Sequence, residues 1–149
     1  MKYVIAVWII ILLCPNSIFA QCGPPPIGYI GLYADDSHSS CCVTGIGFYP
    51  VEMWIWFLPG VNGMICVEFA ISYPENVIRS TVIQHPSISV VLGDLETGIS
   101  ACYPDCQTDW IWQYHQLLYV TDSTPSWIEI IPHPEAYGYV NVAPCTPGY

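Results

Sequence analysis

The segment that decides the fold runs from Val51 to Tyr73 and reads VEMWIWFLPGVNGMICVEFAISY. Apolar residues alternate with other side chains on both sides of a Pro-Gly-Val-Asn-Gly turn, which is the pattern of strands that bury one face. We therefore expect strands over 51–58 and 64–73, joined as a β-hairpin. In the second strand the odd-numbered residues are predicted to face the core: Ile65, Val67, Phe69, Ile71 and Tyr73.

The first of these strands places two tryptophans on its other face. If its odd-numbered residues also face the core, Trp54 and Trp56 lie on the opposite surface of the sheet, near Glu68. A later predicted strand repeats this pattern, because Trp110, Trp112 and Tyr114 share one face. Flat aromatic rings beside a carboxylate are a common way to hold sugar rings.

The candidate ligand-binding residues are therefore Trp54, Trp56, Glu68, Trp110 and Trp112. Two alternatives stay open for the tryptophans. They can be covered by a loop or belong to a second core layer, since tryptophan is mostly buried on average. They can also form a contact with another protein.

The rest of the chain reads as short strands separated by Pro, Gly, Asp or Asn, and no stretch keeps a helical apolar period. About eight or nine strands at roughly ten-residue spacing predict an all-β, antiparallel β-sandwich, either jelly-roll or immunoglobulin-like. We expect a single domain over 21–149. The further predicted strands are 29–34, 79–83, 88–92, 99–103, 110–120, 127–131 and 137–142.

The N-terminus has the layout of a secretory signal peptide. Lys2 precedes an apolar run from Tyr3 to Leu13, and Ile18 and Ala20 fit a cleavage site before Gln21. The run is shorter than the ~20 residues that span a bilayer. We expect residues 1–20 to be removed and the protein to be secreted, to the cell surface, the medium or a periplasm, without membrane insertion.

The charge balance limits the classes of partner that the protein can bind. Two Lys and Arg residues face twelve Asp and Glu residues, giving a net charge of −10. Nucleic acids and anionic membrane surfaces are excluded, because binding them takes several basic residues in a patch. Sheet edges also lack the lysines that usually protect them, which favours self-association or docking on a partner. The expected partners are a protein or a polysaccharide.

The cysteines predict disulfides. Of the eight, Cys14 falls in the predicted signal peptide, and an odd number remains for an oxidising compartment. Their connectivity stays open. Cys102 and Cys106 enclose Tyr-Pro-Asp and are a candidate local disulfide. Structural zinc on the cysteines and calcium on the loop acids, such as Asp94 and Glu96, are the alternatives, and we expect neither metal nor cofactor.

Catalysis has little support in the sequence. The histidines His38, His85, His115 and His133 are scattered, with no motif that links them. A catalytic triad needs an acid, a base and a nucleophile that converge from separate elements beside an oxyanion hole. We therefore expect no enzymatic activity.

Three stretches resemble secreted bacterial β-sandwich proteins: Gly28–Asp35, the Cys41-Cys42 pair and Tyr49–Trp56. This resemblance implies export and no particular activity. A second resemblance, over roughly Val51 to Pro134, is to cohesin-like modules. Phe69–Ile78 is similar to their strand that ends in Tyr before a turn, although Pro74 stands where they have Asp.

The cohesin-like resemblance implies a non-catalytic extracellular module whose relatives bind proteins or polysaccharides. We expect a secreted binding or structural module that contacts another protein at the cell surface or in an extracellular assembly. The alternative function is a carbohydrate-binding module that uses exposed tryptophans.

Overall fold

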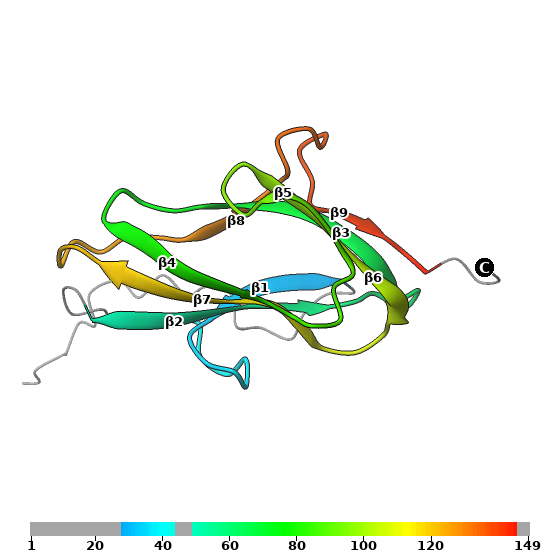
Figure 1. Ribbon diagram of the computed structural model, residues 1–149, viewed down its shortest axis with the longest axis horizontal. Helices are drawn as coiled ribbons and strands as arrows, with labels where there is room; N and C mark the ends of the chain where they lie inside the picture. The colour runs from blue at the N-terminus through cyan, green and yellow to red at the C-terminus, as the bar shows by residue number, and fades with distance from the viewer. Residues whose placement is uncertain (1–27, 44–48, 146–149) are drawn as a thin grey trace, which may run out of the picture.

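The protein is a β-sandwich of two antiparallel sheets packed face to face (Figure 1), as predicted. The computed structural model describes residues 28–43 and 49–145, so the predicted signal peptide lies outside the described residues. The described residues contain no helix that could cross a membrane. The strands are β1 (Tyr29–Tyr33), β2 (Pro50–Leu58), β3 (Met64–Ser72), β4 (Val77–Gln84), β5 (Val90–Asp94), β6 (Gly98–Gln107), β7 (Ile111–Val120), β8 (Glu129–Ile131) and β9 (Asn141–Ala143).

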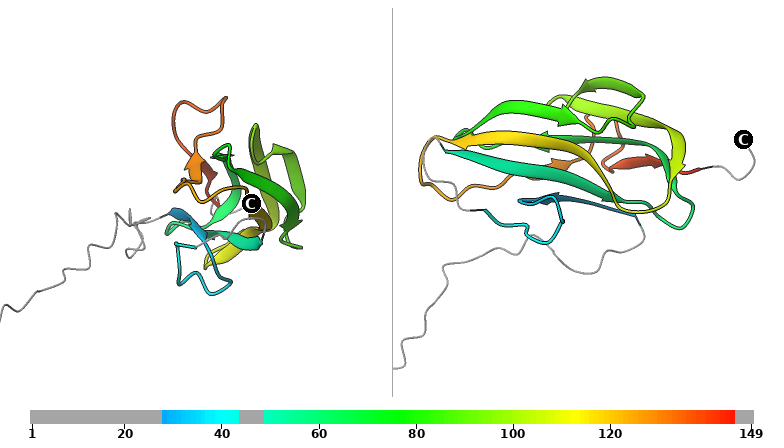
Figure 2. Two further views of the ribbon diagram at one scale, coloured as in Figure 1. Left: turned by 90° about the vertical axis from the view of Figure 1, so that its left-hand side faces the viewer. Right: turned by 60° about the horizontal axis from the view of Figure 1, so that its bottom comes forward.

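Sheet A has the order β1-β2-β7-β4, and sheet B has the order β5-β6-β3-β8, with β9 also paired to β3. Figure 2 (right) shows the outer face of sheet A, the face turned away from sheet B. At one side of the sandwich β1 contacts β8. The other side is formed by the edge strands β4 and β5, and an ion pair links Arg79 of β4 to Glu96 in the β5–β6 turn.

The core lies between the alternating faces of β2 and β3. The odd-numbered residues of β2 from Val51 to Phe57 are buried, and so are Val67, Phe69 and Ile71 of β3. This confirms the predicted core faces of both strands. Ile65 and Tyr73 are exceptions and are only half-buried. The pairing with β6 shifts its register at Ile65, and Met64 is fully buried instead, whereas Tyr73 lies just beyond β3 and packs against the core.

The predicted hairpin is wrong. β2 pairs with β1 and β7, whereas β3 pairs with β6, β8 and β9, so the turn over 59–63 carries the chain from one sheet to the other. Two strands with one apolar face each can pair side by side or face each other across a core. In both arrangements apolar residues recur at every second position of the sequence. Gly63 allows the crossing, with a φ of 66° that L side chains rarely adopt.

A β-bulge in β7 reverses the alternation that the sequence predicts. Ile55 pairs with Tyr114 and Trp56 pairs with Trp112, so Gln113 is the extra residue. Gln113 and Tyr114 are both buried, whereas Trp112 stays half-buried on the outer face. The prediction that Tyr114 shares a face with Trp112 is therefore wrong.

Two buried glutamines of β7 differ in their hydrogen bonding. Gln116 accepts a hydrogen bond from the Tyr73 hydroxyl at 2.7 Å. Gln113 is fully buried, and neither polar atom of its amide has a hydrogen-bond partner among the described residues. Burying an unpaired polar group costs about 1–3 kcal/mol, so we expect Gln113 to lower the stability of the fold.

We predict that Gln113→Leu raises the free energy of unfolding by about 1–2 kcal/mol, because it removes the unpaired amide at nearly constant volume. Urea denaturation of the oxidised protein, followed by tryptophan fluorescence, measures the change. Gln116→Leu is the matched control and is expected to give a smaller gain or a loss of stability, because it removes an amide nitrogen that also lacks a partner among the described residues but leaves the Tyr73 hydroxyl without its acceptor. Equal changes in the two variants would contradict this account.

Candidate functional site

The four candidate tryptophans lie together on the outer face of sheet A. Trp54 and Trp56 come from β2, Trp112 from β7, and Trp110 from the residue just before β7. Alternation along β2 turns its tryptophans away from the core, and the bulge at Gln113 keeps Trp112 on the same side. All four side chains are half-buried. We call these tryptophans, with the histidines that pack on them, the aromatic face.

Three histidines complete the aromatic face. The His115 ring stacks on Trp54, with centroids 4.0 Å apart and 12° between the planes. His38 stacks on Trp110 at 4.4 Å and 20°, and the edge of His85 meets Trp112 at 4.5 Å and 75°. The sequence offered no sign of this cluster, because these histidines come from a loop and from two different strand regions whose pairing the spacing does not reveal.

The loop over 35–40 holds His38 against the aromatic face. It projects from sheet A on the side away from sheet B (Figure 1). One Asp35 carboxylate oxygen accepts hydrogen bonds from the Ser37 N–H and hydroxyl and from the Ser39 N–H, at 2.7–3.0 Å. The other accepts from the Ser39 hydroxyl and the Ser40 N–H, at 3.0 and 2.7 Å. These bonds, the Ser39 N–H first, hold the pKa of Asp35 well below its usual range.

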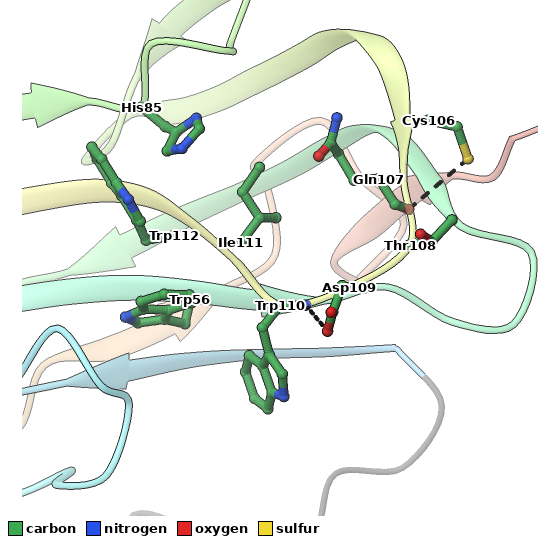
Figure 3. Close-up of a pocket in the computed structure, with 9 residues that line it drawn as sticks. All are labelled: Trp56, His85, Cys106, Gln107, Thr108, Asp109, Trp110, Ile111 and Trp112. Atoms are coloured by element: carbon green, nitrogen blue, oxygen red, sulfur yellow. Dashed lines mark hydrogen bonds between the residues drawn. The ribbon is translucent and has the colours of Figure 1, made fainter.

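A cleft of ≈ 340 Å³ opens beside the tryptophans (Figure 3). Trp56, Trp110 and Trp112 contribute apolar surface to it, and its other lining residues include His85, the last two residues of β6 and the loop that leads to β7. In that loop, Asp109 accepts a hydrogen bond from the Trp110 N–H at 2.7 Å. The cleft thus combines indole rings with a carboxylate, a hydroxyl and an amide, the groups that bind a polar ligand with apolar patches.

Glu68 does not belong to this site. It lies on β3 in sheet B, where it accepts hydrogen bonds from the Ser100 hydroxyl and the Asn141 amide, both at 3.2 Å. The prediction that Glu68 lies near Trp54 and Trp56 is wrong. It depended on the hairpin, and the crossing at 59–63 places Glu68 and these tryptophans on different sheets.

The cysteines form disulfides, but the local Cys102–Cys106 pairing is wrong. Cys66 and Cys102 are cross-strand neighbours of β3 and β6 and are disulfide-bonded, and Cys106 is bonded to Cys145. Cys102 and Cys106 both lie in extended β6, where residues four apart are about 13 Å from each other. Cys41 is disulfide-bonded as well, and Cys42 is a free, exposed thiol. These bonds fit an oxidising extracellular or periplasmic environment.

The edge strands β4 and β5 form the second notable surface. Within residues 28–43 and 49–145, β4 pairs only with β7 and β5 only with β6. Five large apolar side chains on these two strands are exposed, by 42–66 per cent: Ile78, Val82, Ile83, Val90 and Leu92. We call this pair of strands the open edge.

Comparison with known proteins adds no family to this description, since no family model, curated protein or solved structure matches the chain. Among the described residues, no three His, Cys, Asp or Glu side chains are grouped so that they could hold a metal ion. The aromatic face and the open edge are thus the two candidate sites.

We predict that Asp35→Ala releases the loop over 35–40 and increases acrylamide quenching of tryptophan fluorescence, because His38 no longer covers Trp56 and Trp110. Asp36→Ala is the matched control, because Asp36 is exposed.

The same readout has a predicted pH dependence. Because folding lowers the pKa of Asp35, the carboxylate stabilises the loop fully above the ordinary carboxyl pKa of about 4, and this stabilisation is lost as the pH falls toward the folded-state value. The difference in quenching between Asp35→Ala and the unsubstituted protein should therefore persist from pH 8 to about 4 and shrink only below that. A difference that already shrinks near neutral pH would contradict the role of Asp35.

Proposed function

We propose that the protein is an exported, non-catalytic binding module that contacts another protein through the open edge. The observation that carries the proposal is the exposure of apolar side chains on two adjacent strands that have no partner on their outer side within the described residues. Such edges accept an added strand from a partner, with main-chain hydrogen bonds giving affinity and alternate side chains giving specificity.

The backbone of β4 supports strand addition. The His85 N–H donates to the Gln113 carbonyl at 2.8 Å, so the backbone of His85 faces β7. Along an antiparallel strand, the backbone N–H and C=O groups of one residue point to the neighbouring strand on one side, and those of the next residue point to the other side. The N–H and C=O of Val82 and Gln84 therefore point away from β7, toward the open side. Lysine, the usual protection of such an edge, occurs in the chain only at Lys2.

The side chain of Val82 supports the same surface. Val82 pairs with the fully buried Gln116 and so faces the interior of the sandwich, yet it is 42 per cent exposed. The two sheets therefore do not close over this side chain. A partner strand laid along β4 would cover it, which adds apolar burial to the main-chain bonds.

To test the proposal, peptides that bind the oxidised protein are selected from a phage-displayed library of random peptides, and their affinities are measured by fluorescence anisotropy. Val82→Pro removes the outward N–H while sparing the bonds to β7, and is expected to weaken the selected peptides at least about tenfold. Val82→Thr keeps the N–H and the branched shape, and is expected to lose much less affinity than Val82→Pro, because it only exchanges one methyl group for a hydroxyl. Selected peptides that bind both variants equally, or a selection that yields none, would refute the proposal.

A second candidate function is carbohydrate binding in the cleft, favoured by the three indoles and Asp109 that line it. Trp112 is the test residue, because the indole N–H groups of Trp54 and Trp56 are buried. If a polysaccharide array yields a ligand, Trp112→Ala should abolish its binding, measured by calorimetry, and Val82→Pro should leave it unchanged. A ligand that binds Trp112→Ala with unchanged affinity does not occupy this cleft.

A further inference from the structure

The two ends of the open edge differ in charge. Four exposed acidic residues surround the start of β4: Glu75, Asp94, Glu96 and Asp122. Glu75 lies in the turn that leads into β4, which the Val77 N–H closes by donating to the Pro74 carbonyl. Asp94 ends β5, and Glu96 follows in the β5–β6 turn, 3.3 Å from Arg79 of β4.

Asp122 reaches the same end from β7. Val77 pairs with Val120, and the Asp122 carboxylate accepts a hydrogen bond at 3.0 Å from Asn76, the residue before β4. Arg79 is the basic residue at this end, and it is already paired with Glu96. The start of β4 therefore carries an excess of negative charge.

Two of these acids are held in the charged form. The Thr97 hydroxyl donates to Asp94 at 2.6 Å, and this bond is the main cause that lowers the pKa of Asp94. The Thr124 N–H donates to Asp122 at 2.8 Å and is the main cause that lowers the pKa of Asp122. The negative charge is thus fixed in place at neutral pH.

The far end of β4 carries fewer acids. Residues 82–89 read VIQHPSIS and contain no acidic residue. A strand that lies along β4 therefore meets four carboxylates at one end and, at the other, an acid-free run beside the single carboxylate of Asp109, which lines the cleft with His85. This asymmetry favours one orientation of a bound strand as well as positive charge on it.

The negative charge also favours a different protein over a second copy of this chain as the partner bound at the open edge. Two copies repel each other, since each carries a net charge of −10. A second copy also brings little to neutralise the acids, because the chain's two bases are Lys2, outside the described residues, and Arg79, which is paired. A partner with free basic side chains gains attraction where a second copy meets repulsion.

We propose, as an extension that rests on the proposed function, that the open edge accepts an extended polypeptide segment with lysine or arginine at its C-terminal end. Every strand pair among the described residues is antiparallel, and a segment added antiparallel to β4 places its C-terminal end beside Val77 and the four acids. Its alternate apolar residues cover Val82 and its neighbours on the edge.

Three synthetic peptides test this inference by fluorescence anisotropy with the oxidised protein. All share an alternating Thr-Val core, and they carry Lys-Lys at the C-terminus, Lys-Lys at the N-terminus, or Glu-Glu at the C-terminus. At low salt, the peptide with C-terminal lysines is expected to bind about tenfold more tightly than the one with glutamates, and more tightly than the one with N-terminal lysines. The differences should shrink at about 0.5 M salt, where charges are screened.

Substitutions in the protein locate the effect. Glu75→Gln should weaken the peptide with C-terminal lysines about twofold to threefold. Asp36→Asn removes an exposed acid that follows β1, at the opposite edge of sheet A from β4, and should leave the affinity unchanged. Val82→Pro should weaken all three peptides, and Val82→Lys serves in its place if the proline variant does not fold.

The outcomes separate the inference from the function on which it rests. Equal affinities for the three peptides at low salt, or a preference for N-terminal lysines, overturn the inference while loss of binding in Val82→Pro still supports the open edge. Binding that survives both Val82 variants overturns the edge itself. Dimers in sedimentation experiments that Val82→Pro abolishes identify a second copy as the occupant, and they also overturn the inference.

Discussion

The structure depends on the burial of two apolar faces, those of β2 and β3, against each other across the core. Ile55 and Phe57 of one strand and Val67 and Phe69 of the other are essentially inaccessible to solvent. Once these strands face each other, they belong to different sheets, and their outer faces point to opposite surfaces of the molecule. The aromatic face and the Glu68 surface are therefore as far apart as the two layers allow, although the residues that form them are close in sequence.

The alternation of apolar residues along a strand predicts which face of the sheet a residue lies on. It does not predict which other strand pairs with that strand. Trp54 and Trp56 could be placed on the outer surface from alternation alone. The partner strands could not, because a hairpin and a crossing between sheets expose the same pattern. The bulge at Gln113 was equally hidden, since an added residue changes the pairing and leaves the composition of the strand unremarkable.

The histidines show how a site can escape sequence reasoning. His38, His85 and His115 share no motif, yet each contacts a tryptophan of the aromatic face. Pairing of β2 with β7 sets His115 opposite Trp54, and the hydrogen bonds of Asp35 bring His38 over the sheet from a loop. Predicting these contacts needs the register of strands distant in the chain, which only the folded structure supplies.

The Cys106–Cys145 disulfide makes folding depend on when this bond forms. It closes a covalent ring that contains β7, β8 and β9, and β7 belongs to sheet A whereas both anchoring cysteines adjoin sheet B. When this bond closes early, β7 must enter between β2 and β4 as the middle of a tethered loop, with fewer conformations open to it. When it closes late, it locks a strand already in place. A chain that acquires its disulfides while folding in an oxidising compartment therefore gains from a slow oxidant or an isomerase that can reopen this bond.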